Sequence, residues 1–353
     1  MAQNADDVGG LSATRPSWTM YRGHGMPPEP DEVIVLPAPP PWRDFDPSSQ
    51  EDTAFDRKLG RPSPGGARTA SRRELDMVNA AITLRRPLIV TGPPGAGKSS
   101  LAYRIARELG LGRVLSWPVN SHSTLRSGLY EYDAIGRMQA AASRYPLQDR
   151  AADSARWQAP ESDIGDFLRL GPIGTALLPG EQPRVLLIDE LDKSDVDLPD
   201  NLLNVFEEGR FEITELLRMR QRNPEVTVHT DDPGEIALVE GGLVQCRAFP
   251  IVVITSNGER EFSAAFLRRC VQLEIPPPDA ADLLLMIRAH LPSLPEEPLG
   301  LVEDFLARIA RGEPAPRSKL LEAVYLLHQD AYAGDPERQQ SLIDSIFGNP
   351  STE

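Results

Sequence analysis

Cysteine is scarce in this chain of 353 residues, and long apolar runs are missing. The two cysteines, Cys246 and Cys270, lie far apart and form no CxxC pair, which indicates a reducing compartment and no metal cluster. No apolar run approaches the length of a transmembrane helix, and the N-terminus lacks the apolar segment of a signal peptide. We therefore expect a cytoplasmic protein that contacts no membrane.

Basic residues are also in deficit. The 37 Lys and Arg residues stand against 52 Asp and Glu residues, which gives a formal net charge of −15. Non-specific binding of nucleic acid requires a basic face, so no nucleic-acid partner is expected. Hydrophobic residues make up 40% of the chain, which is enough for a substantial core.

The most informative segment is an apolar run followed by a glycine-rich loop and a helical pattern. The loop reads Gly92-Pro93-Pro94-Gly95-Ala96-Gly97-Lys98-Ser99, with Ser100 next. This is the GxxxxGKS pattern of a P-loop, in which the glycines let the backbone N–H groups close around phosphates. Lys98 would reach the β- and γ-phosphates, and the Ser99 hydroxyl would ligate Mg²⁺. The segment therefore predicts a binding site for ATP with Mg²⁺.

Two other apolar strands lead into polar residues. The run 185–188 ends at Asp189-Glu190, and the run 251–255 is followed by Asn257. Open parallel sheets bind ligands at the carboxyl ends of their strands. We expect Asp189 to hold Mg²⁺ and Glu190 to accept a proton from the attacking water, or to orient it. Asn257 could orient that water or contact the γ-phosphate, although an Asn here is also typical of a turn.

Three arginines complete the candidate site. Arg268 and Arg269 precede the strand pattern at 271–275, and Arg317 begins a helical pattern after a Pro-Ala-Pro segment. A planar guanidinium can stabilise charge on a phosphoryl group during transfer. The alternatives are a solvated basic turn for the pair and a surface position for Arg317.

The chain divides into three parts by composition. Residues 1–66 are rich in proline and predict a disordered segment, in which the apolar islands 33–36 and 42–45 could dock on the folded chain or on a partner. Residues 67–276 alternate strands and helices, with an insertion near 121–175 and a hairpin near 226–247. Residues 277–349 show only helices. The expected strands are 87–91, 114–119, 184–188, 251–255 and 271–275; the expected helices are 71–84, 98–109, 198–208, 279–291, 301–311, 317–331 and 336–347.

Together these motifs resemble those of AAA+ ATPases, and most closely of the MoxR-like group, over roughly residues 68 to 347. The P-loop, Asp189-Glu190 and Asn257 match the first, second and sensor motifs of the family, and Gly171-Pro172-Ile173 and 202–208 resemble MoxR-like segments. The resemblance implies an α/β fold, a P-loop NTPase parallel sheet flanked by helices and followed by a small all-α lid domain. It places Arg269, or its neighbour Arg268, as the arginine finger and Arg317 as the second sensor.

The resemblance also implies a function. MoxR-like proteins form rings, usually hexameric, with ATP at the subunit interfaces, and act as remodelling or chaperone-type ATPases on a protein client, often one with a von Willebrand A domain. A slow nucleotide-dependent switch or scaffold in a multi-gene signalling or defence system is one alternative. A P-loop small-molecule kinase is another, but it has no need of Glu190 or Asn257.

Overall fold

The computed structural model describes residues 38–44, 53–61, 70–143, 164–313, 316–329, 331 and 335–348. These residues form two compact units. One runs to Asp282, and the other combines the described residues before 62 with those from Leu283 onward. The division falls inside a helix that begins at Ala280, whereas the sequence places the domain boundary at 276–277. Among the helices described, none combines the length and the apolar character needed to span a bilayer.

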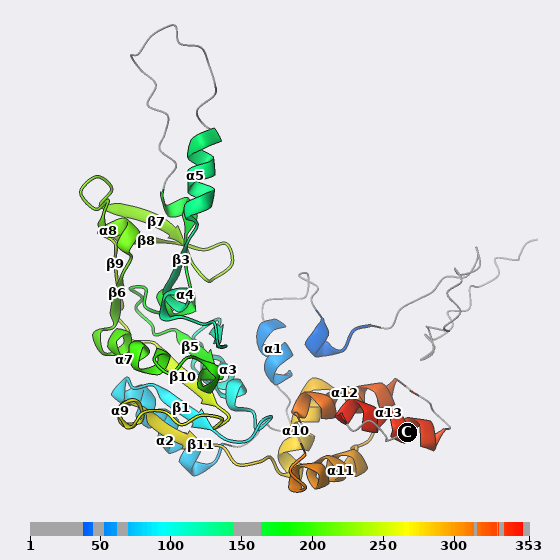
Figure 1. Cartoon of the computed structure of the whole chain (residues 1–353). Coiled ribbons are helices and arrows are strands. Elements are labelled where there is room, and N and C mark those ends of the chain that lie inside the picture. The colour runs from blue at the N-terminus through cyan, green and yellow to red at the C-terminus, as the bar shows by residue number, and fades with distance from the viewer. Residues whose placement is uncertain are drawn as a thin grey trace, which may run out of the picture. The chain divides into compact units, whose positions relative to one another are not determined.

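The centre of the first unit is a parallel sheet with the strand order β11-β1-β10-β5-β2 (Figure 1). Its strands are β1 (Leu88–Thr91), β2 (Leu115–Pro118), β5 (Val185–Asp189), β10 (Ile251–Ser256) and β11 (Val271–Glu274). All five were expected from the sequence, and β1, β5 and β10 are continuous apolar runs. Such continuous apolar runs are typical of strands buried on both faces, and β10 is buried along its whole length.

Helices flank this sheet. They are α2 (Arg72–Leu84), α3 (Lys98–Leu109), α6 (Pro172–Ala176), α7 (Leu198–Glu208) and α9 (Ala264–Arg269). Helix α3 packs on β5 and β10, and α2 packs on β1 and β11. Ile89 and Ile188 lie beside Ile254 in the register of the sheet, and all three share one apolar cluster with residues of α7 and α9. The sequence predicted α2, α3 and α7; α9 was missed because it is short and buries only Phe266.

A second sheet has six strands in the order β3-β4-β7-β8-β9-β6. They are β3 (Tyr130–Tyr132), β4 (Leu168–Leu170), β6 (Arg210–Glu212), β7 (Glu225–His229), β8 (Ile236–Glu240) and β9 (Leu243–Gln245). The expected hairpin is confirmed as the antiparallel pair β7–β8. Strand β9 extends it through a tight turn at Gly241-Gly242, where both residues have positive φ. Between β6 and β7 lies α8 (Thr214–Leu217).

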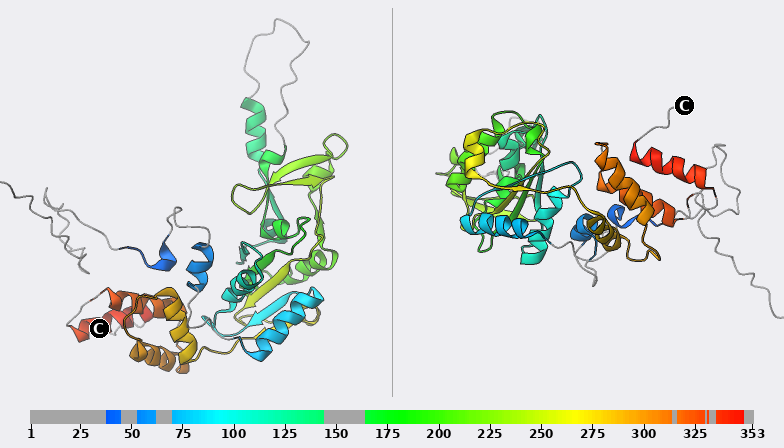
Figure 2. Two further views of the ribbon diagram at one scale, coloured as in Figure 1. Left: turned by 180° about the vertical axis from the view of Figure 1, so that it is seen from behind. Right: turned by 90° about the horizontal axis from the view of Figure 1, so that it is seen from below.

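The expected insertion near 121–175 contains regular structure. It holds α4 (Leu125–Leu129), β3, α5 (Ala134–Ser143), the 3₁₀ helix η2 (Ile164–Phe167), β4 and α6. Strands β3 and β4 pair at one end of the second sheet. Helix α5 follows β3 and extends away from this sheet, as both Figure 1 and Figure 2 show. Residues 144–163 lie outside the described residues.

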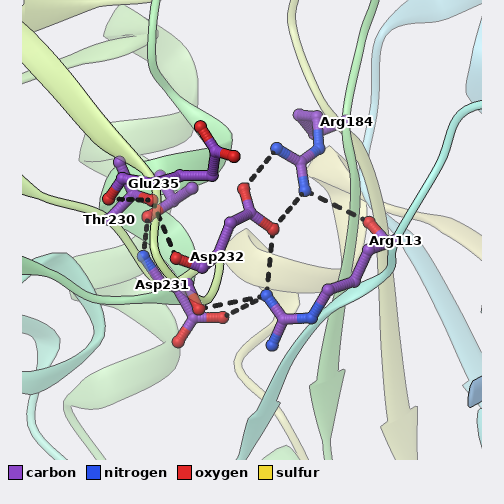
Figure 3. A network of polar contacts seen from close by, with 7 residues as sticks. Arg113, Arg184, Thr230, Asp231, Asp232 and Glu235 are labelled. Carbon is purple, nitrogen blue, oxygen red and sulfur yellow. Dashed lines mark hydrogen bonds and ion pairs between the residues drawn. The ribbon is translucent and has the colours of Figure 1, made fainter. Parts of the chain in front are cut away.

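The turn between β7 and β8 is fastened to the start of two core strands (Figure 3). The Asp232 carboxylate accepts hydrogen bonds from Arg184 at 2.8 and 3.0 Å and from Arg113 at 3.0 Å. Burial favours the neutral acid, but the hydrogen bonds from the two arginines outweigh it and lower the pKa of Asp232. Arg184 directly precedes β5, so the turn is held at the opposite end of β5 from Asp189.

The second unit contains the four helices that the sequence predicts after Pro278. They are α10 (Ala280–His290), α11 (Leu299–Ala310), α12 (Arg317–His328) and α13 (Pro336–Phe347). Their apolar cluster includes Ile287, Phe305 and Val324. Arg308 is buried and forms ion pairs with Asp304 and Asp344, which joins α11 to α13.

Part of the N-terminal segment is ordered, which corrects the expectation of disorder through residue 66. The 3₁₀ helix η1 (Pro41–Arg43) and α1 (Thr53–Leu59) belong to the helical unit. The Trp42 ring lies edge-on to His290 and Tyr325, with centroids 6.1 and 5.8 Å away. The Tyr325 hydroxyl donates to the Ala38 carbonyl at 2.7 Å. Trp42 therefore docks on the folded chain, which is one of the two alternatives for the apolar islands. The island 33–36 lies outside the described residues.

Trp42→Ala is expected to destabilise the helical unit by about 2 kcal/mol, because an aromatic side chain loses its contact with an apolar cluster. Arg43→Ala is the matched control, since Arg43 is the exposed neighbour in the same 3₁₀ helix. Chemical denaturation of the full chain, followed by circular dichroism, measures both variants. Equal unfolding free energies in the two variants would mean that Trp42 contributes nothing to the unit.

Candidate functional site

The glycine loop joins β1 to α3 and is shaped by backbone angles that other residues resist. Gly92 has φ 147°, and a Cβ there would lie 2.4 Å from the Ile275 carbonyl oxygen. Gly97 has φ 87° and forms the N-cap of α3. Only glycine meets both demands without strain. The loop thus turns tightly into α3. The first N–H groups of a helix have no partner within the helix, so those of α3 are free to bind an anion at its N-terminus.

Lys98 is buried, with 6% of its surface exposed. Its ammonium donates hydrogen bonds to the carbonyls of Gly92 and Pro93, at 2.8 and 3.0 Å, and to Asn257 Oδ1 at 2.7 Å. Burial lowers the pKa of Lys98, and the carboxylates of nearby Asp192, Asp189 and Glu190 oppose that shift. The side chain therefore connects the loop to the end of β10.

Asp189, at the end of β5, receives two hydroxyl groups on one oxygen. Ser99 Oγ donates to Oδ1 at 2.6 Å and Thr255 Oγ1 donates to it at 2.7 Å. Thr255 also accepts from the backbone N–H of Glu190 at 2.8 Å. The sequence analysis did not predict Thr255 as a site residue. A hydroxyl side chain near the end of a buried strand was the feature that could have indicated it.

A hydroxyl and a carboxylate side by side suit Mg²⁺, which prefers oxygen ligands and retains several waters. Ser99 and Asp189 supply that pair of oxygens. Within the described residues, no group of three or more His, Cys, Asp or Glu side chains is placed to hold a metal ion. The donor set thus fits a cation held jointly by two side chains, water and phosphate.

Glu190 adopts a left-handed backbone conformation, with φ 61° and ψ 48°. Such a conformation costs a residue with a side chain roughly 1–3 kcal/mol and is concentrated at functional sites. Its Oε2 accepts from Lys193 Nζ at 2.7 Å, and its Oε1 lies 3.4 Å from Asn257 Nδ2. Lys193 is a second residue that the sequence reasoning missed.

Asn257 links the two charged side chains of the site. Its amide oxygen accepts from Lys98, and its amide nitrogen faces Glu190. The structure thus brings five of the predicted residues together at the carboxyl edge of the core sheet: Lys98, Ser99, Asp189, Glu190 and Asn257. Ser100 lies in the first turn of α3, where its hydroxyl donates to the Gly97 carbonyl at 2.7 Å.

Two of the predicted arginines, Arg268 and Arg269, lie apart from this group. Arg268 and Arg269 occupy the last turn of α9, where Arg269 pairs with Glu207 of α7 and Arg268 donates to the carbonyl of Ala264. In the part of the chain that the structure describes, neither contacts the Lys98–Asn257 group. Arg317 is the first residue of α12 in the helical unit.

A family model described as AAA domain (dynein-related subfamily) matches residues 87–270, which is more than half of the chain. The chain belongs to this AAA family. The matched range of the AAA domain begins at the residue before β1 and ends at Cys270, directly after α9. It contains every site residue described above except Arg317. An AAA domain is a nucleotide-binding ATPase domain, in agreement with the P-loop and the fold.

Comparison with curated protein sequences finds no match. Solved structures do match this AAA domain protein, among them NtrX from Brucella abortus in complex with ADP. That structure is 15% identical, with a TM-score of 0.36, and the alignment covers 76% of this chain and 52% of NtrX. The chain thus spans about half the length of NtrX.

Proposed function

We propose that this AAA domain hydrolyses ATP to ADP and phosphate. The observation that carries the proposal is the hydrogen-bonded group at the carboxyl edge of the core sheet, where Lys98, Asn257 and Glu190 are joined directly behind the glycine loop. The loop would bind the phosphates through its backbone N–H groups, and Lys98 would exchange its carbonyl partners for phosphate oxygens. Ser99 and Asp189 would hold Mg²⁺, which neutralises phosphate charge when bound.

Glu190 is the proposed general base. A carboxylate at this position accepts the proton of a water that attacks the γ-phosphorus, while the bond from phosphorus to the bridging oxygen breaks and ADP leaves. Asn257 would orient that water through the amide group that already faces Glu190. Release of inorganic phosphate from ATP by the full chain, over many turnovers, tests the proposal. A switch would stop after one cycle, and a kinase would require a phosphate acceptor.

We also propose that the protein works as a MoxR-like chaperone or remodelling ATPase. It would act as a homo-oligomeric ring, hexameric by the family resemblance, in the cytoplasm, on a protein client such as one with a von Willebrand A domain. The exposed ends of Arg268 and Arg269 support a role at a neighbouring subunit. Exposed apolar side chains on α5 and β8 support contact with a protein: Ile135, Met138, Ile236 and Leu238. Sedimentation velocity with and without ATP tests the ring.

Lys98→Ala is expected to weaken ATP binding by about 100-fold, because the loop loses a charge-assisted hydrogen bond to phosphate. Lys193→Ala is the matched control for binding, since this lysine contacts Glu190 rather than the loop. Isothermal titration calorimetry measures both affinities. Wild-type affinity in Lys98→Ala would contradict the assignment of the P-loop.

A further inference from the structure

Asp192 is a buried acid whose charge opposes the lowering of the Lys98 pKa, but whose hydrogen bonds have no part in the roles above. It is the second residue of the 3₁₀ helix η3 (Leu191–Lys193), which begins directly after Glu190, and 4% of its surface is exposed. Its Oδ2 accepts hydrogen bonds from the backbone N–H groups of Asn257 and Glu259, at 2.9 and 3.1 Å. The carboxylate therefore connects the segment after β5 to the loop after β10.

A second fastening lies at the far end of the same loop. The Arg260 guanidinium donates to the Ser194 carbonyl at 2.5 Å and to the Asp195 carbonyl at 3.3 Å. Residues 257–260 are thus held to residues 192–195 at both ends, by a buried carboxylate and by a guanidinium. This arrangement fixes the backbone from which the Asn257 side chain extends.

The other oxygen of Asp192, Oδ1, makes the carboxylate costly to bury. Oδ1 is buried and has no hydrogen-bond partner in the described residues. A buried carboxylate that leaves one oxygen unsatisfied costs stability compared with an apolar side chain. The benefit that offsets this cost lies in the two N–H groups bound by Oδ2, and one of these belongs to the residue that joins Lys98 to Glu190.

We propose that Asp192 is a positioning residue for ATP hydrolysis: by binding the backbone N–H groups of Asn257 and Glu259, it sets the place of the Asn257 amide between Lys98 and Glu190. This proposal rests on the proposed function. A backbone shift at Asn257 would move both hydrogen bonds of its side chain together, and positioning errors of this kind reduce turnover strongly.

The test compares Asp192→Ala, Asp192→Asn and the control Asp195→Ala, which removes an exposed carboxylate just beyond η3. We expect Asp192→Ala to lower kcat about 10-fold with ATP affinity within about 3-fold, because positioning acts on the reacting geometry. Asp192→Asn keeps an acceptor oxygen and should retain most of the activity. In the Asn257→Ala background, Asp192→Ala should add little, because both changes act through one side chain.

Hydrogen exchange of the Asn257 and Glu259 amides gives a readout that does not depend on catalysis. Protection should fall in Asp192→Ala and persist in Asp192→Asn. If Asp192→Ala does not fold, Asp192→Leu takes its place: leucine fills a similar volume and accepts no hydrogen bond, so kcat and amide protection should fall together. Unchanged kcat in a folded Asp192→Ala or Asp192→Leu, a change of only one readout in Asp192→Asn, or additive effects with Asn257→Ala would overturn the proposal. Absence of hydrolysis in the wild type would instead overturn the proposed function. Hydrogen exchange would still show whether Asp192 holds the backbone N–H groups of Asn257 and Glu259.

Discussion

Glu190→Gln is expected to bind ATP as the wild type does and to release phosphate about 10³-fold more slowly, since general-base catalysis contributes factors of this order. Glutamine keeps the length of the side chain and can adopt the same left-handed backbone conformation as glutamate, with φ near the 61° of Glu190. It cannot accept a proton from water at neutral pH, and it loses the charge that pairs with Lys193.

Two measurements on the same preparation are needed for this variant. Calorimetry should give an ATP affinity close to that of the wild type, and a phosphate-release assay should show the loss of turnover. Glu261→Gln is the matched control, because Glu261 is an exposed glutamate near the same edge of the sheet. Wild-type phosphate release in Glu190→Gln would remove Glu190 from the mechanism.

Arg269→Ala should lower turnover by about 10³-fold if the guanidinium stabilises the transition state at a neighbouring subunit, as arginine fingers do. ATP binding should change much less, because the contact matters mainly in the transition state. In the single chain, Arg269 pairs with Glu207, and both side chains are about half exposed, at 46% and 53%. An exposed ion pair of this kind is worth little, so a nucleotide could replace Glu207 at small cost.

Mixing tests whether Arg269 acts in trans. An Arg269→Ala subunit keeps its own P-loop, and a Lys98→Ala subunit keeps its own finger. Mixtures of the two inactive variants should therefore recover some hydrolysis at mixed interfaces. Arg268→Ala is the control for the neighbouring position. No recovery in mixtures shown to co-assemble would argue against a finger in trans, and full activity of Arg269→Ala would transfer the role to Arg268 or to neither.

The sequence predicted the core of the fold because its three central strands, β1, β10 and β5, are continuous apolar runs and its longer helices carry clear ends. Helix α3 begins at Lys98 and ends before Gly110, as the pattern predicts. The site residues at strand ends could be predicted for the same reason. Parallel strands deliver their carboxyl ends to one edge, so Asp189 and Asn257 had to lie near the glycine loop.

The features that were missed depend on contacts between distant parts of the chain. Strands β3, β4, β6 and β9 have three residues each, which is too short for a periodic pattern, and they pair across long separations. Trp42 docks on helices that lie more than two hundred residues later in the sequence. In the sequence, Asp192 and Lys193 are ordinary charged residues. Only the folded chain brings Asp192 to the backbone of Asn257 and Lys193 to the carboxylate of Glu190.

The Asp232 contact with Arg113 and Arg184 makes the attachment of the β7–β8 turn sensitive to protons. Because these arginines lower the pKa of Asp232, the folded chain binds a proton at this carboxylate less readily than the unfolded chain does. The stabilisation is complete above the pKa of the unfolded state and is lost as the pH falls through the folded-state pKa. Acid therefore weakens the hold of the β7–β8 turn on β2 and β5 through a charge change, whereas the apolar residues of the core sheet do not titrate.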